Sequence, residues 1–291
     1  MKKWNLIVDV EKCNGCFNCF ISCKDEYVGN VHPGYSAEQP LHGHRWIDVR
    51  TFERGQTPML DVTFMATTCN HCDDAPCVRA GKGAVRKRED GIVLIDPDKA
   101  KDRKDLTGSC PYGAIWWNEE KRLPQKWTFD AHLLDRGWKV PRCVQSCATG
   151  AMRALKIEDD EMQRLSAAEE LQVLHAEYGT RPRVYYKNLH RVNRCFIGGT
   201  VIAQVSGVKD CLSAAWVVVN QGDRKVGEAR TDVFGEFRVD RLEPASGTYT
   251  VVIAAPGHES QARSVDLGQS VYLGTIELKP LAPVTRREPT P

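Results

Sequence analysis

Four cysteines near the N-terminus have the spacing of a metal-binding loop, Cys13-x2-Cys16-x2-Cys19-x3-Cys23. In bacterial [4Fe–4S] proteins this run lets three cysteines bind one cluster while the fourth binds another. Sulfurs at successive i+3 positions can wrap three corners of a cubane, and the remaining sulfur then points toward a second cube. Structural zinc is the alternative, but zinc sites usually draw two cysteines from each of two knuckles. The run therefore favours iron–sulfur clusters.

The later cysteines form three further groups: Cys69-x2-Cys72-x4-Cys77, Cys110 alone, and Cys143-x3-Cys147. Cys110 is followed by Pro-Tyr-Gly-Ala, and Cys147 is followed by Ala-Thr-Gly-Ala. This weak internal repeat indicates that Cys110 and Cys147 have equivalent places in two cluster sites.

The positions of the cysteines argue against disulfides. Ten of the twelve lie between residues 13 and 147, and sulfurs two or three residues apart rarely pair in an unstrained bridge. The N-terminus has the features of neither a secretory signal nor a twin-arginine sequence, so we expect a cytoplasmic protein whose thiolates bind metal, the alternative being a partner that carries the export signal for both chains. Cys195 and Cys211 lie outside every group and are expected to be unpaired core thiols.

Charge and hydropathy narrow the class of partner. The chain has 40 Lys and Arg against 38 Asp and Glu, so its formal charge of +2 gives no reason to expect nucleic acid. No segment approaches the roughly eighteen apolar residues of a membrane-spanning helix, so no membrane partner is expected. With 291 residues, the chain is long enough for two domains.

The elements that would position the cysteines are short. Apolar patterns predict strands at residues 6–10 and 91–96, and a hairpin of 45–52 with 59–64. Residues 159–177 are predicted to form an amphipathic helix before Gly179, with an apolar face of Met162, Leu165, Leu171 and Leu174.

The pattern changes after Cys195 to alternating segments separated by Gly and Asp turns. Strands are predicted at residues 200–205, 215–219, 236–239, 248–253 and 271–278. Short strands at this spacing are typical of an all-β sandwich. We therefore expect an α+β cluster-binding domain over 1–195, a β-sandwich domain over 196–280 and an extended Pro-rich tail over 281–291.

The cysteine groups resemble those of the four-cluster ferredoxin subunits of dimethyl sulfoxide reductase-class molybdenum bis-pterin oxidoreductases. The resemblance covers about residues 5–155 and implies a duplicated bacterial ferredoxin-like fold. In that family the first motif pairs with the fourth, and the second pairs with the third. Carried onto this chain, the pairing implies cluster 1 on Cys13, Cys16, Cys19 and Cys147. It implies cluster 2 on Cys69, Cys72, Cys77 and Cys110.

Two further cluster positions depart from that family. One would need Gly81, Ala100, Arg103 and Leu106, none of which binds iron, so this cluster is expected to be absent. The other keeps Cys23 and Cys143 but has Trp127 and Asp130 at its remaining corners. We infer a third cluster on Cys23, Cys143 and Asp130, with His132 as one candidate for the fourth ligand. The alternative is that both cysteines are relics packed in the core. The chain should then hold two to three [4Fe–4S] clusters, with three favoured.

The second half resembles a transthyretin- or carboxypeptidase-regulatory-like β domain in three segments: Gly198–Val201, Thr231–Phe237 and Gly247–Val251. Together with the lost cluster, this domain is similar to the small-subunit family of pyrogallol–phloroglucinol transhydroxylase and resorcinol hydroxylase. The resemblance implies a heterodimer, or a higher oligomer, with a large catalytic subunit that carries molybdenum and molybdopterin guanine dinucleotide. The partner would transfer hydroxyl groups to, or hydroxylate, polyhydroxylated aromatics in anaerobic metabolism. This chain would transfer electrons and supply no catalytic residue.

Two other functions stay open at this point. One is a stand-alone multi-cluster electron carrier or redox sensor, and the other is a zinc-stabilised interaction protein that binds through its β domain. His71, between Cys69 and Cys72, could suggest zinc. Because the adjacent sulfurs already satisfy a cube, we expect His71 to shield a cluster or face the partner.

Overall fold

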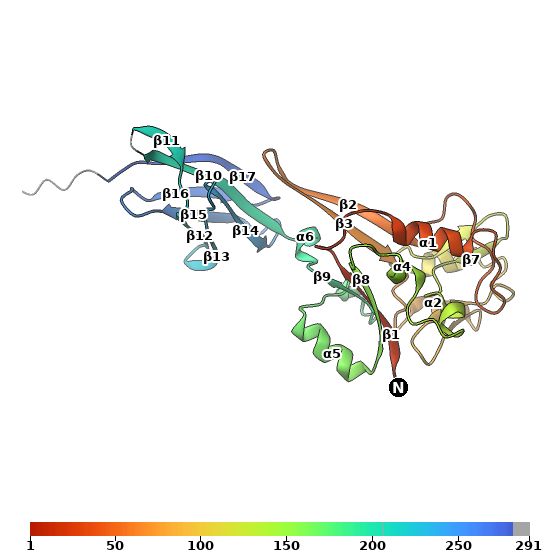
Figure 1. Ribbon diagram of the computed structural model, residues 1–291. Helices are drawn as coiled ribbons and strands as arrows, with labels where there is room; N and C mark the ends of the chain where they lie inside the picture. The colour runs from red at the N-terminus through yellow and green to blue at the C-terminus, as the bar shows by residue number, and fades with distance from the viewer. Residues whose placement is uncertain (206, 282–291) are drawn as a thin grey trace, which may run out of the picture. The chain divides into compact units, whose positions relative to one another are not determined.

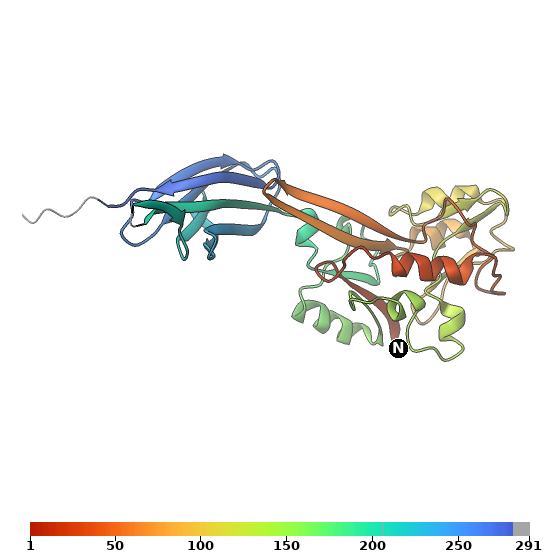
Figure 2. The ribbon, with the colours of Figure 1, turned by 45° about the horizontal axis from the view of Figure 1, so that its top comes forward.

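The computed structural model describes residues 1–205 and 207–281, and the chain divides into two compact units (Figures 1 and 2). Unit 1 comprises Met1–Phe52 and Thr63–Leu189, and unit 2 comprises Glu53–Val62 and His190–Pro291. The predicted tail lies outside the described residues from position 282 onward. Among the described residues, no helix has the length and apolar character needed to cross a membrane.

A three-stranded sheet in unit 1 positions the first and last cysteine-containing segments of that unit. The central strand β1 (Lys3–Asp9) pairs antiparallel with β8 (Met152–Ile157) and parallel with β9 (Val184–Lys187). In this register Val8 lies opposite Met152. The end of β1 therefore lies beside the start of β8. The loop that follows β1 and the loop that precedes β8 also lie side by side.

Helix α5 (Asp159–Ala168) is shorter than predicted. Its Met162 and Leu165 pack with Ile7 of the central strand, which confirms the part of the predicted apolar face that lies in the helix. Leu174, in contrast, lies beyond the helix and outside this core. The helix ends because Glu170 adopts a left-handed φ of 52°, and the Leu171 N–H then donates to the Ser166 carbonyl at 2.9 Å. Leu171 still reaches the same core from beyond the helix, so the apolar periodicity of the sequence continues past the last helical residue.

Three two-stranded hairpins have all or part of their residues in unit 1. The predicted hairpin is confirmed with longer strands, β2 (Ile47–Gln56) and β3 (Met59–Thr68). The predicted strand before Pro97 is confirmed as β5 (Val93–Ile95), which pairs with β4 (Val85–Lys87). The third hairpin joins β6 (Trp116–Asn118) to β7 (Leu123–Gln125).

Unit 1 also contains short helices, some of which carry or flank cysteines. They are α1 (Asn18–Tyr27), α2 (Pro76–Gly81), the 3-10 helix η1 (Lys104–Ser109), α3 (Ala131–Leu134), α4 (Arg142–Gln145) and the 3-10 helix η2 (Ala176–Tyr178).

Unit 2 contains two four-stranded sheets that follow the single-turn helix α6 (His190–Asn193). The order in one sheet is β11-β10-β14 with β17 paired to β10, and the order in the other is β13-β12-β15-β16. Inward-facing residues alternate along the strands, as in Tyr249, Val251 and Ile253, and share one apolar core with Val217 and Ile276. The strands are β10 (Cys195–Val205), β11 (Val208–Cys211), β12 (Trp216–Gln221), β13 (Arg224–Arg230), β14 (Glu236–Leu242), β15 (Thr248–Ala254), β16 (Gln261–Asp266) and β17 (Val271–Leu278).

The segment Glu53–Val62 belongs to unit 2 through a buried ion-pair network. Arg54 donates to both oxygens of Asp240, at 2.7 and 2.8 Å, and its Nε donates to Asp61 at 2.8 Å. The side chains of Arg54 and Asp61 are each only 9% exposed. At Gly55, which has a φ of 87°, a Cβ would lie 2.5 Å from the ring of Phe196. Only glycine therefore lets this segment approach β10 so closely.

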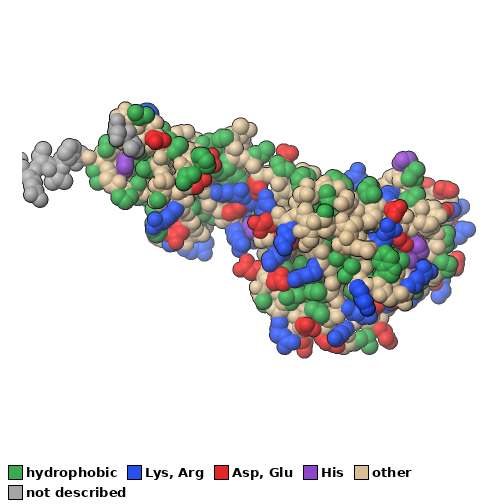
Figure 3. Space-filling model, in the orientation of Figure 1, with side chains coloured by type: hydrophobic (Ala, Val, Ile, Leu, Met, Phe, Trp, Pro, Cys, Tyr) green, Lys and Arg blue, Asp and Glu red, His purple; other side chains and the backbone are tan. Residues whose placement is uncertain are grey.

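The two cysteines outside the motifs have different environments. Cys195 is buried in the core of unit 2, as predicted. Cys211 is exposed at the end of β11, so its prediction as a core thiol was wrong. Over the face in Figure 3, Lys and Arg side chains are interspersed with Asp and Glu, as the small net charge leads one to expect.

Candidate metal centres

Site 1 collects four thiols from two distant segments. Cys13 and Cys16 lie in the loop after β1, Cys19 lies in the first turn of α1, and Cys147 follows α4. Burial is the main reason that the pKa of Cys19 rises to about 12, and Cys13, Cys147 and Cys16 raise it further by charge repulsion. Such repulsion acts between groups that lie close together. The structure thus brings the four predicted thiols of cluster 1 into one site.

Hydrogen bonds hold these two segments together. The Asp9 N–H donates to the Ala151 carbonyl at 2.7 Å, which joins the loop after β1 to the turn before β8. The Ser146 hydroxyl lies 3.0 Å from the Ser22 hydroxyl and 3.4 Å from the carbonyl of Asn18, so it links α4 to α1. The position of Cys147 is therefore set by both the sheet and the helix pair.

Site 2 is a cavity of about 340 Å³ lined by Cys69, Cys72, Cys77 and Cys110. The first two follow β3, Cys77 lies in α2, and Cys110 follows η1. Burial is the main cause that raises the pKa of Cys72 to about 12 and that of Cys77 to about 11. The charges of the other site 2 cysteines add to both shifts. Buried thiols this close ionise together only when a cation compensates them, so the donor set suits a metal cluster.

His71 offers site 2 a hydrogen-bond donor that lacks a partner. Its Nδ1 accepts the N–H of Val93 at 3.0 Å, so the neutral imidazole carries its proton on Nε2. Burial is the main cause that lowers the pKa of His71 well below its ordinary value and keeps the ring neutral. Nε2 is buried without a partner, and the ring lines the cavity with the four cysteines. A cluster sulfur would satisfy this N–H, so the residues of site 2 fit a bound cube.

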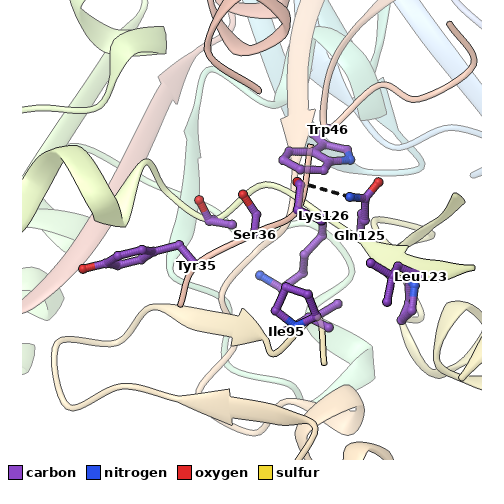
Figure 4. Close-up of a pocket in the computed structure, with 11 residues that line it drawn as sticks. Tyr35, Ser36, Trp46, Ile95, Leu123, Gln125 and Lys126 are labelled. Atoms are coloured by element: carbon purple, nitrogen blue, oxygen red, sulfur yellow. Dashed lines mark hydrogen bonds between the residues drawn. The ribbon is translucent and has the colours of Figure 1, made fainter. Parts of the chain in front are cut away.

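Lys126 places a positive charge beside the same cavity. The residue is 3% exposed, and its ammonium donates to the carbonyls of Val93 at 2.5 Å and Trp127 at 3.1 Å. Figure 4 shows Lys126 beside Ile95, Trp46 and Gln125 in a neighbouring cavity of about 280 Å³. Because Lys126 also lines site 2, its charge can act on a cluster there.

Cys110 and Cys147, the last cysteine of each site, are followed by the same kind of turn. The N–H of Gly113 donates to the Cys110 carbonyl at 3.1 Å, and the N–H of Gly150 donates to the Cys147 carbonyl at 3.1 Å. The glycines have φ values of 65° and 64°, which glycine adopts at no steric cost. The repeat seen in the sequence thus corresponds to one turn used twice.

The predicted absent cluster lies where the structure has an apolar core. Ala100 and Leu106 are fully buried and pack around Val85 beside site 2. A Cβ at Gly81 would lie 2.7 Å from the Val85 side chain, and Arg103 donates to the Ala80 carbonyl at 3.0 Å. Side chains occupy the space that this cluster would need.

The predicted third cluster does not fit the contacts of its ligands. Cys23, Cys143 and Asp130 are neighbours in the fully buried interior, as expected. However, Asp130 Oδ1 accepts hydrogen bonds from the Tyr27 hydroxyl at 2.7 Å and the Trp127 indole at 3.0 Å. Its Oδ2 accepts the N–H of Arg142 at 2.8 Å. Both oxygens are thus engaged by protein donors.

His132 points to a different group of side chains. Its Nε2 lies 2.7 Å from Oε1 of Glu26, and its ring stacks on His32 with centroids 3.7 Å apart. The other oxygen of Glu26 pairs with Arg142 at 2.5 Å. His132 is therefore hydrogen-bonded to Glu26, and the prediction that it completes a cluster has no support in these contacts.

Several residues near the sites were not expected from the sequence. A hydrogen bond from Thr180 lowers the pKa of Cys72, which burial raises, and the Thr180 hydroxyl lies 2.6 Å from that of Tyr112. Thr180 has no motif around it, so no sequence signal could have found it. For Lys126 the sequence offered one signal: it is a cation directly before Trp127, which stands at a ligand position of the predicted third cluster.

The fold and the two sets of thiols define the class of this protein as an iron–sulfur electron-transfer subunit. Residues 60–157 match the 4Fe-4S dicluster domain, and residues 197–279 match the carboxypeptidase regulatory-like domain. These matches confirm a ferredoxin-like domain followed by a regulatory-like β domain, with helices and strands mixed.

Relatives across the whole chain give the family. The chain is 44% identical to the pyrogallol hydroxytransferase small subunit of Pelobacter acidigallici over 281 residues, which is 96% of this chain and 100% of that protein. It therefore belongs to the family of that small subunit, within the iron–sulfur electron-transfer subunits of molybdenum oxidoreductases and transhydroxylases.

More distant relatives match about two thirds of the chain. A putative iron–sulfur subunit of dimethyl sulfoxide reductase from Halobacterium salinarum is 32% identical over 65% of this chain and 80% of its own length. A tetrathionate reductase subunit from Salmonella typhimurium is 30% identical over 64% of this chain and 73% of its own length. Both are named as subunits of reductases, and the first is named as an iron–sulfur subunit.

Proposed function

We propose that Cys13, Cys16, Cys19 and Cys147 hold one [4Fe–4S] cluster, and that Cys69, Cys72, Cys77 and Cys110 hold a second. One observation carries this proposal: two sets of four thiols, each drawn from segments far apart in the chain, converge on separate sites. Cysteines that bind [4Fe–4S] clusters typically lie in short, closely spaced motifs like those of these two sets.

We also propose that the cluster domain is an internal duplication. Each site takes its third cysteine from the start of a helix, Cys19 in α1 and Cys77 in α2. Each takes its fourth cysteine from the turn with a left-handed glycine, Gly150 or Gly113. The predicted domain division at 195/196 belongs to the same proposal, with two changes that follow from the compact units: the β domain begins at His190, and Glu53–Val62 packs with it.

The residues of this chain would bind the clusters and tune them rather than act on substrate. When bound, each cluster accepts and releases one electron. His71 would donate its Nε2–H to cluster sulfur, Lys126 would offset negative charge, and the apolar core around Val85 would exclude water. No acid, base or nucleophile of this chain is assigned to the substrate reaction.

The partner would be a large subunit that carries molybdenum and molybdopterin guanine dinucleotide and forms a heterodimer or higher oligomer with this chain. Its substrate would be a polyhydroxylated aromatic that undergoes hydroxyl transfer or hydroxylation. The identity to the pyrogallol hydroxytransferase small subunit over its whole length supports this assignment. The cytoplasmic location stays a prediction of the sequence.

Anaerobic co-expression with the large subunit tests the proposal. We expect a complex that contains molybdenum, at least eight irons per copy of this chain, and equal acid-labile sulfide. It should act on pyrogallol or resorcinol, and dithionite should reduce its clusters by one electron each. Purification of this chain alone with intact clusters would favour a stand-alone carrier. Two or three zinc ions without sulfide would refute an electron-transfer role.

A further inference from the structure

We propose that this chain holds two [4Fe–4S] clusters, and that a plug of Trp127, Asp130 and Tyr27 closes its third cluster position. The proposal deepens the function proposed above and rests on the ligand sets of sites 1 and 2. The plug lies where Cys23 and Cys143 frame the position at which the sequence predicted a cluster of mixed ligation.

The ligand chemistry at this position is incomplete. A cubane needs one ligand for each of its four irons, and only Cys23 and Cys143 supply thiols. The indole of Trp127 is a hydrogen-bond donor without a lone pair for iron. Asp130 would have to release the donors on one of its oxygens before that oxygen could bind metal. Two corners of a cube would therefore lack protein ligands.

The polar atoms of the plug already satisfy one another. Asp130 accepts from Tyr27, Trp127 and the Arg142 backbone, and the Tyr27 hydroxyl also lies 2.6 Å from that of Thr128. At site 2, in contrast, the Nε2 of His71 is buried and has no partner. A site built for a cluster leaves such a donor free for cluster sulfur, whereas the plug leaves none.

Large rings fill the space beside the two cysteines. Trp127 and Tyr27 are both 0% exposed. The Trp127 ring stacks on Phe129 with centroids 4.7 Å apart, and the Tyr27 ring lies 4.8 Å from that of Trp46. An indole at a corner where a cluster would need a cysteine sulfur takes up room that the cube itself requires. Because interiors are close-packed, these rings cannot make room for a cube without moving their neighbours.

The same chain closes its other missing position in a related way. At that position Ala100, Leu106 and Gly81 stand where ligands would be needed, and an apolar core fills the space. The third position instead keeps two buried thiols, so a polar group must be accommodated among them. The hydrogen-bonded plug meets that need, because buried polar atoms are costly unless they are paired.

The plug touches the surroundings of both proposed clusters. Cys19 of site 1 lies close enough to raise the pKa of Cys143 further, although burial is the larger cause. On the other side, the Trp127 ring lies 5.7 Å from His71 of site 2. An electron leaving one cluster would therefore cross packed aromatic side chains to reach the other, without an intervening metal.

Iron analysis of the anaerobically purified complex tests the proposal. We expect about eight irons and eight sulfides per copy of this chain, which correspond to two cubes. Cys23→Ser and Asp130→Asn should leave both values unchanged. A value near twelve that falls by about four in Cys23→Ser would overturn the plug, although the electron-transfer function would stand. Fewer than eight irons would instead refute the ligand sets on which the plug rests.

A gain of cluster provides a second measurement that does not depend on loss of folding. The double variant Trp127→Cys/Asp130→Cys would give the position four cysteines together with Cys23 and Cys143. We expect it to bind about four more irons and to show an additional paramagnetic signal after reduction. The matched control Trp127→Phe/Asp130→Asn should keep about eight irons. A double cysteine variant with unchanged iron would contradict the view that this place is a closed cluster position.

Discussion

The indole Nε1–H of Trp127 donates a 3.0 Å hydrogen bond to Oδ1 of Asp130, and the two residues are 0% and 2% exposed. In the sequence these residues stand at two corners of a cluster position. In the structure they bind each other. The pairing supports the proposal that a hydrogen bond between these two residues takes the place of a metal site.

Substitution of Cys147 by serine tests the convergence of distant segments at site 1. We expect Cys147→Ser to lose about four irons and the signal of one cluster, because the hydroxyl is a poorer iron ligand than a thiolate. Electron paramagnetic resonance of the reduced complex and iron analysis would measure this. Cys211→Ser is the matched control, since Cys211 is exposed in β11. An unchanged site 1 signal in Cys147→Ser would disprove the pairing.

Removal of the imidazole N–H at site 2 should lower a reduction potential. In His71→Phe the cluster on Cys69, Cys72, Cys77 and Cys110 would lose a donor that favours its more negative, reduced state. We expect a fall on the order of tens of millivolts in a redox titration followed by paramagnetic resonance. His71→Asn keeps an N–H and tolerates the left-handed φ of 45°. In this variant the reduction potential of the site 2 cluster should therefore fall less than in His71→Phe. The exposed His42→Phe should have no effect.

The charge of Lys126 should shift the same potential in the same direction. A buried cation stabilises the added electron, so Lys126→Met should lower the potential of the site 2 cluster by tens of millivolts or more. Lys101→Met is the control, because that side chain is exposed. Redox titration at two salt concentrations would separate the effect of a buried charge, which salt changes little, from that of an exposed charge, which salt screens. A potential that rises in Lys126→Met would contradict the placement of the ammonium beside the cluster.

The network around Arg54 should govern the stability of unit 2. Arg54→Met removes the bidentate partner of Asp240 and one of the three arginines that bond to Asp61, and breaking such a buried pair costs about 3–5 kcal/mol. Hydrogen exchange of β10 and β14 in the intact chain would measure the loss of protection. Lys209→Met removes the more exposed pair with Glu277 and should cost less than about 1 kcal/mol.

The same network predicts a dependence on pH. Burial alone would raise the pKa of Asp61, but its hydrogen bonds with Arg191, Arg54 and Arg238 hold it well below the ordinary value. The pKa of Asp240 is likewise lowered by Arg54 against the effect of burial. Their stabilisation is therefore complete above about pH 4 and is lost as pH falls through the lowered folded values. The difference between Arg54→Met and the parent should shrink over that range.

The sequence predicted the elements whose residues carry a strong local signal. The spacing of Cys13, Cys16 and Cys19 forces a loop, and alternation from Tyr249 to Ile253 forces a strand with one buried face. Thr180 was not predicted as a site residue because its role depends on contacts across the fold rather than on neighbours in the chain. The end of α5 was missed because a left-handed Glu170 leaves no mark in apolar periodicity.

The third position shows a different limit. From the sequence, Asp130 was a carboxylate beside two thiols, and iron was a reasonable partner for it. Only the structure places the hydroxyl of Tyr27, 103 residues away, on the same oxygen as the indole of Trp127. Which partner a buried acid takes depends on such long-range placement.

The segment Glu53–Val62 has a consequence for how this protein could have been assembled in evolution. Arg191 bonds to Asp61 across 130 residues of chain, so the β unit is encoded by two separated stretches. A single recombination event upstream of residue 190 would deliver strands with an unmatched Asp240 and an uncovered Phe196. Donor and recipient genes could exchange this unit only if the distant hairpin tip travelled with it or changed in step.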